Sequence, residues 1–354
     1  MIRKILVLLT IPLLLLFGGA GCTFRIGAGA EGGVFRTLDG GNVWLPLSRL
    51  EKTTGGYGSV GDVQVQKILF DDRDSNSVFL ATKENGIYAS INGGETWSSV
   101  LPGVAVADMA LDTSSRCVLY VAAARQIFKT TDCSQHWNVV FNEARKDVSV
   151  TSISVDPIHP ETMYATNTVG DILKSNDRGT TWSVIYRVPD TLIEGMLIDR
   201  WDSNLVYIFT RKGIFRSPNK GVMWENISSA LEGKPRIFSF TAAQSLDQKG
   251  AFLYASRGSV WKTQNAGSTW EQVPFLTGEG TVTVLAAAAN PQNTHEIYYA
   301  TPSTFYSTQD NGLTWVPRPL PSSRAGSYIL VDPYNAHRVY LGTQVYKPPS
   351  LILF

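Results

Sequence analysis

A short phrase that ends in tryptophan occurs seven times along this chain of 354 residues. Each copy begins with Ser or Thr and has Asp or Asn at its third position and Trp at its eighth; six copies have Gly at the fifth. Successive tryptophans lie 53, 40, 45, 42, 46 and 45 residues apart. A period of this size indicates an array of similar supersecondary units. The copies are Thr37–Trp44, Ser90–Trp97, Thr130–Trp137, Ser175–Trp182, Ser217–Trp224, Thr263–Trp270 and Thr308–Trp315.

Each copy lies between two segments with a strand pattern. In the fourth unit, Thr151–Val155, Met163–Thr166, Asp171–Lys174 and Trp182–Tyr186 are short apolar or alternating runs separated by residues typical of turns. This pattern predicts a four-stranded antiparallel meander. Strand-rich units repeated every 40 to 50 residues predict the blades of a β-propeller.

The two ends of the chain predict how the ring closes. Only one strand, Gly33–Arg36, precedes the first copy, and two strands, Ser327–Val331 and Arg338–Gly342, follow the last. Joined together, they complete one composite blade, which removes two free sheet edges. With six internal blades, the expectation is an all-β, seven-bladed propeller of four-stranded antiparallel blades over residues 33–346.

The composition of the repeated phrase suggests its role in a turn. Its Asp or Asn is expected to accept hydrogen bonds from turn amides, its Gly to adopt positive φ, and its Trp to fill space between blades. The phrase resembles the Asp-box, or bacterial neuraminidase repeat, of sialidases, sortilin-type propellers, xyloglucanases and the photosystem II assembly factor family. The resemblance implies a propeller hairpin and no particular chemistry. The third copy has Ser134 in place of Gly and His136 in place of Thr or Ser, so its turn is expected to be strained or differently shaped.

The N-terminal segment has the pattern of an export signal. The basic start Met1–Lys4 is followed by a 13-residue apolar run, Ile5–Phe17, and then by small residues and Cys22. The run is short for a membrane-spanning helix and suits a secretory signal. The cysteine resembles that of a bacterial lipoprotein signal, although Gly19 stands where Leu is usual. Ordinary secretion and an uncleaved anchor are the alternatives.

These features predict a domain order and a location. Acylation of Cys22 would hold an extracytoplasmic protein on a membrane, at the cell surface or on the periplasmic side. The predicted segments are a signal peptide over 1–21, a flexible tether over 22–32, the propeller, and a C-terminal tail over 347–354.

Two further cysteines, Cys117 and Cys133, flank one predicted hairpin. Its strands are Val118–Ala123 and Gln126–Thr130, and tight pairing about the turn near Ala124 and Arg125 brings Cys117 opposite residue 132 or 133. An exported protein permits a disulfide there. Two buried free thiols are the alternative.

The charge balance argues against several classes of ligand. The chain has 31 basic and 30 acidic residues, so it has no nucleic-acid footprint. His159, His295 and His337 occupy equivalent turns of different blades, which the fold keeps too far apart to share an ion. Neither a metal nor a cofactor is expected, and the propeller is expected to be monomeric.

A binding surface is expected on the side of the ring opposite the repeated phrases. The loops there carry the basic residues proposed for binding, and two acidic residues accompany them. The interpretation is recognition of a protein or of an acidic peptide or glycan, and solvated loop charges are the alternative. The basic residues are Lys83, Arg125, Arg211, Lys212 and Arg257, and the acidic ones are Glu84 and Asp171.

Enzymatic interpretations are less favoured, although they stay open. Phe24–Gly27 is similar to the Phe-Arg-Ile-Pro phrase of sialidases but lacks the Pro and lies outside any blade. A glycosidase needs two carboxylates about 5 to 10 Å apart. Size, blade number and leader resemble the photosystem II assembly factor family most, with no link to photosynthesis drawn. The main hypothesis is therefore a non-enzymatic binding or assembly scaffold, and the alternative is a glycoside hydrolase or lyase. The candidate carboxylates are Glu84, Asp171, Asp190, Glu194 and Glu279.

Overall fold

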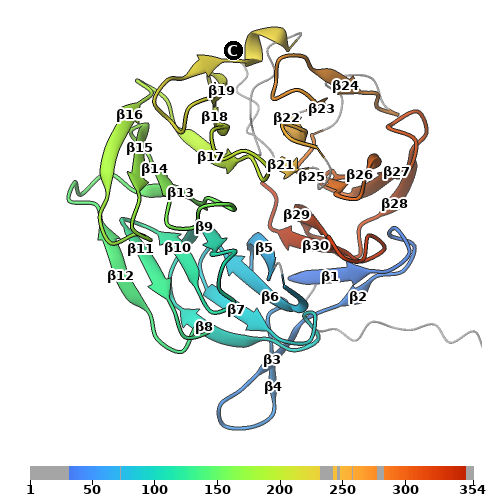
Figure 1. The fold of residues 1–354 in the computed structure, drawn as a ribbon. Helices are drawn as coiled ribbons and strands as arrows, with labels where there is room; N and C mark the ends of the chain where they lie inside the picture. The colour runs from blue at the N-terminus through green and yellow to red at the C-terminus, as the bar shows by residue number, and fades with distance from the viewer. Residues whose placement is uncertain are drawn as a thin grey trace, which may run out of the picture.

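The computed structural model describes residues 32–71, 73–231, 242–244, 248–256, 258–276 and 283–347. Seven four-stranded antiparallel sheets are arranged in a ring around a central axis (Figure 1). Each blade is named below by its first strand, which lies nearest the axis. One short 3-10 helix, η1 (Ser228–Ala230), is present in the described part of the chain, and no helix there is long and apolar enough to cross a membrane.

The strands of each blade follow one another in sequence, except in the composite blade. The β5 blade comprises β5 (Val65–Asp71), β6 (Asp74–Thr82), β7 (Gly86–Ser90) and β8 (Ser98–Pro102); the β9 blade, β9 (Val106–Leu111), β10 (Leu119–Ala123), β11 (Gln126–Thr130) and β12 (Asn138–Asn142). The β13 blade comprises β13 (Val150–Val155), β14 (Met163–Asn167), β15 (Asp171–Ser175) and β16 (Ser183–Arg187); the β17 blade, β17 (Ile193–Ile198), β18 (Val206–Thr210), β19 (Gly213–Ser217) and β20 (Glu225–Asn226). The β21 blade comprises β21 (Ala242–Gln244), β22 (Phe252–Ser256), β23 (Ser259–Thr263) and β24 (Glu271–Val273); the β25 blade, β25 (Ala286–Asn290), β26 (Asn293–Ala300), β27 (Thr304–Thr308) and β28 (Val316–Pro319).

The ring is closed by a composite blade, as the sequence predicts. Its strands are β29 (Ala325–Val331), β30 (Val339–Gln344), β1 (Val34–Thr37) and β2 (Leu45–Pro46), hydrogen-bonded in that order. β1 runs antiparallel to β30, with Phe35 opposite Leu341. The first and last described strands therefore pair directly and leave no open blade edge at the closure.

The repeated phrase forms a turn, here called the repeat turn, between the third and fourth strands of every blade. In the β13 blade, the Ser175 hydroxyl accepts the amide of Gly179 at 2.9 Å, and an Asp177 carboxylate oxygen accepts the amide of Thr181 at 2.8 Å. Equivalent pairs of bonds form in the other six copies. The turn is thus encoded locally, because a side chain at each of two positions satisfies a backbone N–H group.

The third repeat turn keeps this shape despite its different sequence. Ser134 adopts a φ of 69° and the preceding Cys133 a φ of 57°, both in the left-handed region. The strain expected there is present, whereas the hydrogen bonds of the turn are the usual ones. Cys117 and Cys133 form the predicted disulfide beside this turn.

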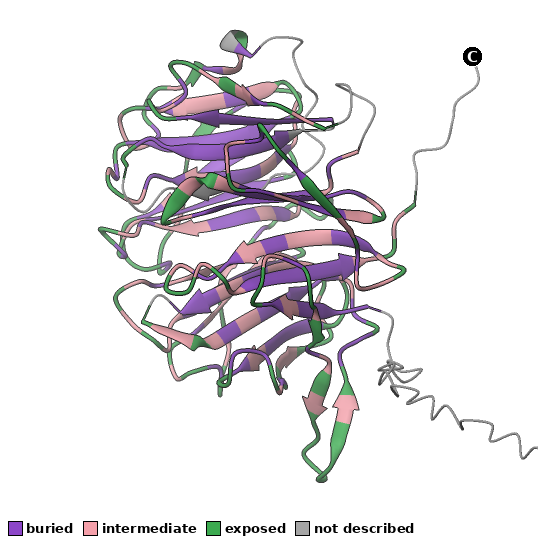
Figure 2. Cartoon of the chain, turned by 90° about the vertical axis from the view of Figure 1, so that its right-hand side faces the viewer, coloured by how far each residue is buried: buried purple, intermediate pink, exposed green. Residues whose placement is uncertain are grey.

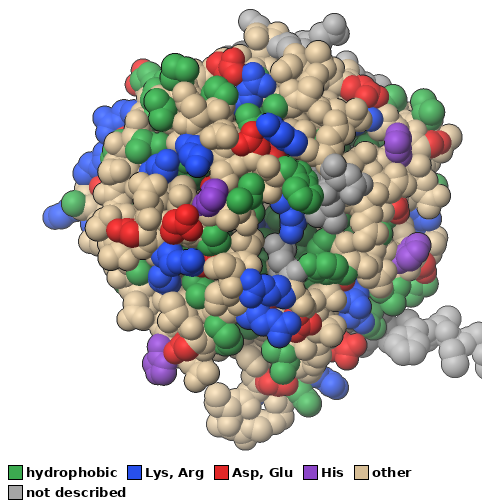
Figure 3. Space-filling view, in the orientation of Figure 1, with side chains coloured by type: hydrophobic (Ala, Val, Ile, Leu, Met, Phe, Trp, Pro, Cys, Tyr) green, Lys and Arg blue, Asp and Glu red, His purple; other side chains and the backbone are tan. Residues whose placement is uncertain are grey.

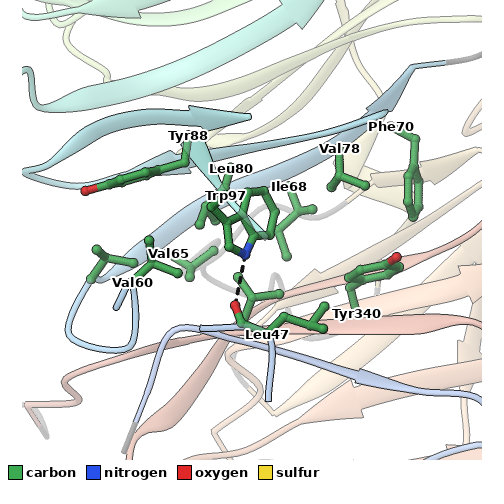
Figure 4. Close-up of a cluster of buried hydrophobic side chains, with 12 residues drawn as sticks. Leu47, Val60, Val65, Ile68, Phe70, Val78, Leu80, Tyr88, Trp97 and Tyr340 are labelled. Atoms are coloured by element: carbon green, nitrogen blue, oxygen red, sulfur yellow. Dashed lines mark hydrogen bonds between the residues drawn. The ribbon is translucent and has the colours of Figure 1, made fainter. Parts of the chain in front are cut away.

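The repeat-turn tryptophans are less uniformly buried than the sequence suggests. Trp97 is fully buried and Trp315 nearly so, whereas the other five are half-buried. Trp97 donates its indole N–H to the carbonyl oxygen of Leu47 at 2.9 Å (Figure 4). This carbonyl belongs to the neighbouring composite blade, so the tryptophan joins two blades by a hydrogen bond as well as by packing.

A second contact between blades involves tyrosines of the second strand. The hydroxyls of Tyr120, Tyr164 and Tyr340 each donate to a backbone carbonyl in the repeat turn of the next blade, at 2.9 to 3.0 Å. Third-strand cations, Lys129 and Lys174 among them, donate to the same carbonyls. These bonds attach the repeat turns of the β5, β13 and β17 blades to the blades that precede them in the ring, whereas the buried hydroxyls of Tyr207, Tyr254 and Tyr299 have no hydrogen-bond partner among the described residues.

One insertion departs from the minimal blade. The hairpin of β3 (Arg49–Glu51) and β4 (Tyr57–Ser59) projects beyond the outer edge of the ring, and its tip is exposed (Figure 2). Its base is attached to the β5 blade, because the amide of Trp97 donates to the Arg49 carbonyl at 2.8 Å. The segment that leads into this hairpin covers Trp97 and explains why this tryptophan is the most buried of the seven.

Candidate functional site

The ring has two different sides. The turn face carries the repeat turns and the turns between first and second strands, and it bears the histidines coloured purple in Figure 3. The loop face, on the opposite side, carries the loops between second and third strands and the connections between blades. β1 runs from the loop face to the repeat turn, and β30 runs in the opposite direction. The start of β1 and the end of β30 therefore both lie on the loop face.

Three of the predicted binding residues lie on the loop face with part of their surface in solvent. Arg211 is exposed, and its Nε lies 2.8 Å from a carboxylate oxygen of Glu194. Lys212 is exposed and donates from Nζ to the carbonyl of Pro189 at 3.0 Å. Arg125 is half-buried at the tip of the β10–β11 hairpin.

The other two predicted binding residues are Lys83 and Arg257. Lys83 lies at the mouth of the central channel, where it donates to the side-chain oxygen of Gln344. Burial lowers the pKa of Lys83, and the charge of Glu84 opposes that shift. Arg257 lies outside the described residues.

The central channel contains a cavity of about 660 Å³ between the first strands of the blades. Lys67 on β5 lines this cavity and lies 2.7 Å from Asp108 on the adjacent β9, which also accepts a hydrogen bond from the hydroxyl of Ser152 on β13 at 2.6 Å. Burial opposes the charge of Lys67, but Asp108 outweighs it, so the pKa of Lys67 is raised. These bonds join three blades, so the main role of Lys67, Asp108 and Ser152 is a structural contact between blades.

Asp171, predicted as an acidic residue of a loop, is instead fully buried at the start of β15. One of its carboxylate oxygens accepts a hydrogen bond from Nε of Arg187. The other oxygen accepts hydrogen bonds from Nη2 of Arg145 at 2.8 Å and from the side-chain amide of Asn167 at 3.1 Å. Burial alone would raise the pKa of Asp171, but the bonds from Arg187, Asn167 and Arg145 lower it to about 2.

A second buried carboxylate joins the same network. Glu143, in the connection that follows β12, binds Arg145 through both oxygens, at 2.8 Å to Nε and 2.6 Å to Nη2. The bond from Arg145 is the main reason that the pKa of Glu143 is lowered. Arg145 therefore bridges two carboxylates from adjacent blades. The four charged side chains Glu143, Arg145, Asp171 and Arg187 are called the arginine network below.

The remaining candidate acids are distributed separately. Glu84 and Asp190 are exposed on the loop face, Glu194 is paired with Arg211, and Glu279 lies outside the described residues. Among the residues that the structure describes, no group of three or more His, Cys, Asp or Glu side chains is placed to hold a metal ion.

Sequence reasoning did not assign the arginine network to a site. Arg145 is one of several charges in a blade connection, and nothing in the repeat pattern singles out Asn167 or Arg187. Their proximity arises because the connection after β12 reaches the next blade, where Nη2 of Arg145 donates to Asp171 at 2.8 Å. No signal of fixed spacing in one sequence could have identified it.

Comparison with known proteins supports the fold and leaves the activity open. No protein-family profile matches the sequence. A xyloglucanase of Acetivibrio thermocellus is 26% identical over 185 residues, which are 47% of this chain and 19% of that protein. The chain thus spans about a fifth of the curated relative that it matches.

Solved structures of two kinds are similar in fold. The GH74 xyloglucanase of Xanthomonas campestris superposes with a TM-score of 0.64 at 16% identity, over 79% of this chain and 51% of that one. YCF48 of Cyanidioschyzon merolae gives 0.62 at 15% identity, over 80% and 96% of the two chains. YCF48 bound to D1 peptide gives 0.60 at 15% identity, over 81% and 94%. The propeller fold is therefore shared by xyloglucanases and by YCF48, and at these identities the likeness shows the fold alone.

Proposed function

We propose that this protein is a non-enzymatic binding or assembly scaffold that recognises a protein, or an acidic peptide or glycan, through its loop face. The proposal includes a location outside the cytoplasm and a membrane anchor at an acylated Cys22, and it is supported by the N-terminal pattern of basic residues, apolar run and cysteine. The observation that carries the proposal is the state of the charges on the loop face. The carboxylates of Asp171 and Glu194 are paired with arginines. Lys212 and Arg125 place basic groups at loop tips, and the exposed acids of the same face include Glu84 and Asp190.

The comparisons support a binding role for the propeller. The chain matches YCF48 structures over nearly their whole length, and one of those is described as bound to a peptide. It matches about half of the xyloglucanase chain. Short loops also favour a flat recognition surface over a deep pocket.

The alternative is a glycoside hydrolase or lyase that uses carboxylates at the loop face. One observation favours it, because Glu143 and Asp171 are brought onto a single arginine, Arg145. A hydrolase of this kind needs an acid whose pKa is raised, so that it holds a proton near neutral pH. The pKa values of both carboxyls are lowered, and that of Asp171 is about 2. Neither is therefore equipped to donate a proton.

Charge reversal tests the binding surface. Arg125, Arg211 and Lys212 changed together to Glu should weaken capture of the partner from solubilised membranes, mainly by slowing association, while the melting temperature stays within a few degrees. The control is reversal of Arg116 and Lys220 on the turn face. Arg178 is unsuitable as a control because it forms an ion pair with buried Asp112.

Equal loss of binding from both faces, or none from either, would reject the loop face as the binding surface. Release of soluble sugar from xyloglucan or a related glucan by the purified protein, abolished in a Glu143→Gln variant that still folds, would establish the enzymatic alternative. The anchor has its own test. Mass spectrometry of protein from bacterial membranes should find acyl chains on Cys22, and Cys22→Ser should release the protein into the soluble fraction.

A further inference from the structure

Five of the first strands carry an extra residue near the loop face. In β5, Val65 pairs with Thr82 and Lys67 with Ala81, so Gln66 between them has no counterpart on β6. The same one-residue bulge occurs in β9, β13, β17 and β29. A bulge redirects the side chain that it adds, and bulges are frequent next to active sites. The extra residues, called the collar below, are Gln66, Ala107, Thr151, Glu194 and Ser327, and all five line the cavity of about 660 Å³ in the central channel.

The charged side chains of the described cavity wall already have partners. Asp108 accepts hydrogen bonds from Lys67, from the hydroxyl of Ser152 and from two backbone amides, so both of its oxygens are used. Glu194 and Lys83 bond to neighbouring side chains. An ion that entered the channel would lose its hydration without gaining an unpaired opposite charge. The wall therefore suits a neutral ligand.

Tyr328 brings an unpaired hydroxyl to this wall. It lies on β29, beside β5 in the ring (Figure 1), and its side chain lines the cavity and is only partly buried. Its hydroxyl bonds to no described residue, whereas the hydroxyls of Ser152 and Thr151 are bonded at 2.6 and 2.8 Å. Burial raises the pKa of Tyr328, so the hydroxyl keeps its proton at neutral pH and can both donate and accept.

Two collar residues have unused polar atoms as well. Gln66 donates its side-chain N–H group to the carbonyl of Ala107 at 3.1 Å, and its amide oxygen bonds to no described residue. The hydroxyl of Ser327, next to Tyr328 in the chain, is buried and also lacks a partner among the described residues. A polar group that is buried without a hydrogen bond costs roughly 1–3 kcal/mol, so a ligand that supplies such bonds is favoured.

Other parts of the cavity wall are apolar. Met196 and Leu197 lie on β17, Leu285 directly precedes β25, and Leu330 lies on β29. Small-molecule sites combine such apolar side chains with a few polar groups, in cavities of about 300–1,000 Å³. A sugar ring matches this wall, because its C–H faces are apolar, its rim carries hydroxyl groups that donate and accept, and it has no charge.

We propose that the central channel binds a neutral sugar of one or two rings. The Tyr328 hydroxyl and the Gln66 amide oxygen bond to hydroxyl groups of the sugar, and the apolar side chains pack against its C–H faces. The site goes beyond the proposed function, since it lies inside the ring and uses none of the basic residues at the loop tips.

Tyr328→Phe is the informative variant, because it removes one oxygen atom and no hydrogen bond to a described residue. Its melting temperature should equal that of the wild type or exceed it slightly, since the deleted hydroxyl is unpaired. The matched control is Tyr186→Phe, which deletes a hydroxyl on β16 at the outer edge of the ring.

The assay is isothermal titration calorimetry of the purified protein with glucose, xylose, galactose and cellobiose. The wild type and Tyr186→Phe should bind at least one of these sugars with the same Kd, of about 1 mM or tighter. Tyr328→Phe should bind that sugar about three- to tenfold more weakly, as expected for the loss of one hydrogen bond. No binding of any of the four sugars by the wild type would overturn the proposal, and so would equal affinities of Tyr328→Phe and the wild type, or equal weakening by both substitutions.

Two charged probes test the assignment of a neutral ligand. Glucuronate and glucosamine should bind the wild type more weakly than the neutral sugars, and tighter binding of either would overturn the assignment. The channel site and the proposed function fail separately. If the triple reversal of Arg125, Arg211 and Lys212 abolishes partner capture but no sugar binds the wild type, the channel site is wrong and the loop face stands. If a sugar binds as described but the reversal leaves partner capture unchanged, the loop face is wrong and the channel site stands.

Discussion

Replacing Ser134 by Gly should make this protein more stable, which is unusual for a buried position. Ser134 is 7% exposed and holds a φ of 69° in the third repeat turn. The six equivalent residues are glycines with φ between 81° and 95°. In addition, the Ser134 hydroxyl is buried without a hydrogen-bond partner among the described residues.

The expected gain follows from three contributions. A residue with a Cβ in the left-handed region costs roughly 1–2 kcal/mol relative to Gly. A buried hydroxyl without a partner costs about 1–3 kcal/mol more. Against these gains, glycine increases the conformational freedom of the unfolded chain, which lowers the free energy of unfolding by about 0.4–1 kcal/mol. The net expectation for Ser134→Gly is a stabilisation of about 1–4 kcal/mol, which corresponds to a rise of several degrees in melting temperature.

Alanine substitutions at two glycines of other repeat turns distinguish the cost of backbone strain from the cost of a steric clash. A Cβ at Gly179 would lie 3.5 Å from the nearest ring atom of Tyr120, so Gly179→Ala should incur little beyond the cost of positive φ. A Cβ at Gly267 would lie 2.3 Å from Cδ1 of Ile227, so Gly267→Ala must move the buried Ile227 side chain and should be the more destabilising variant.

Differential scanning calorimetry at one scan rate, without reductant, measures all three variants. The order of melting temperatures should be Ser134→Gly, wild type, Gly179→Ala and Gly267→Ala. A melting temperature of Ser134→Gly below that of the wild type would refute the argument, and so would Gly267→Ala being as stable as Gly179→Ala.

Three other perturbations have defined outcomes. Trp97→Ala should cost about 3–5 kcal/mol in denaturant unfolding, because the ring is fully buried and its N–H is bonded; a loss below about 1 kcal/mol would contradict that packing. Changing Cys117 and Cys133 to Ser should cost about 2–4 kcal/mol, and iodoacetamide labelling of the wild type without reductant would show that the bridge is missing. The folded pKa of Asp171, about 2, lies below the ordinary 3.8, so its contribution to stability is complete above about pH 4 and is lost as the pH falls through 2. Asp171→Asn should therefore flatten the fall in melting temperature between pH 4 and 2, and an unchanged slope would argue against the ion pairs.

The sequence by itself determined the blade, its number and the closure of the ring. This was possible because the repeat turn is local. A hydroxyl at the first position and a carboxylate or amide oxygen at the third bind backbone amides within the same turn, as in Ser175–Trp182. The unequal burial of the tryptophans was not predicted, because it depends on what the neighbouring blade places over each ring. Leu47 and the segment around it cover Trp97, whereas Trp182 has no such insertion beside it.

Only the tertiary structure decided which charges are available for binding. From the sequence, Asp171 is an acidic loop residue, and Arg145 and Arg187 are unremarkable charges separated by 42 positions. In the folded ring, the connection after β12 lies against the next blade and brings both arginines onto the buried Asp171. The repeat pattern describes how one blade turns, and it carries no information about side chains that meet across two blades. That meeting is set by the packing of the blades in the ring, and it pairs the carboxylates of Asp171 and Glu143 with arginines.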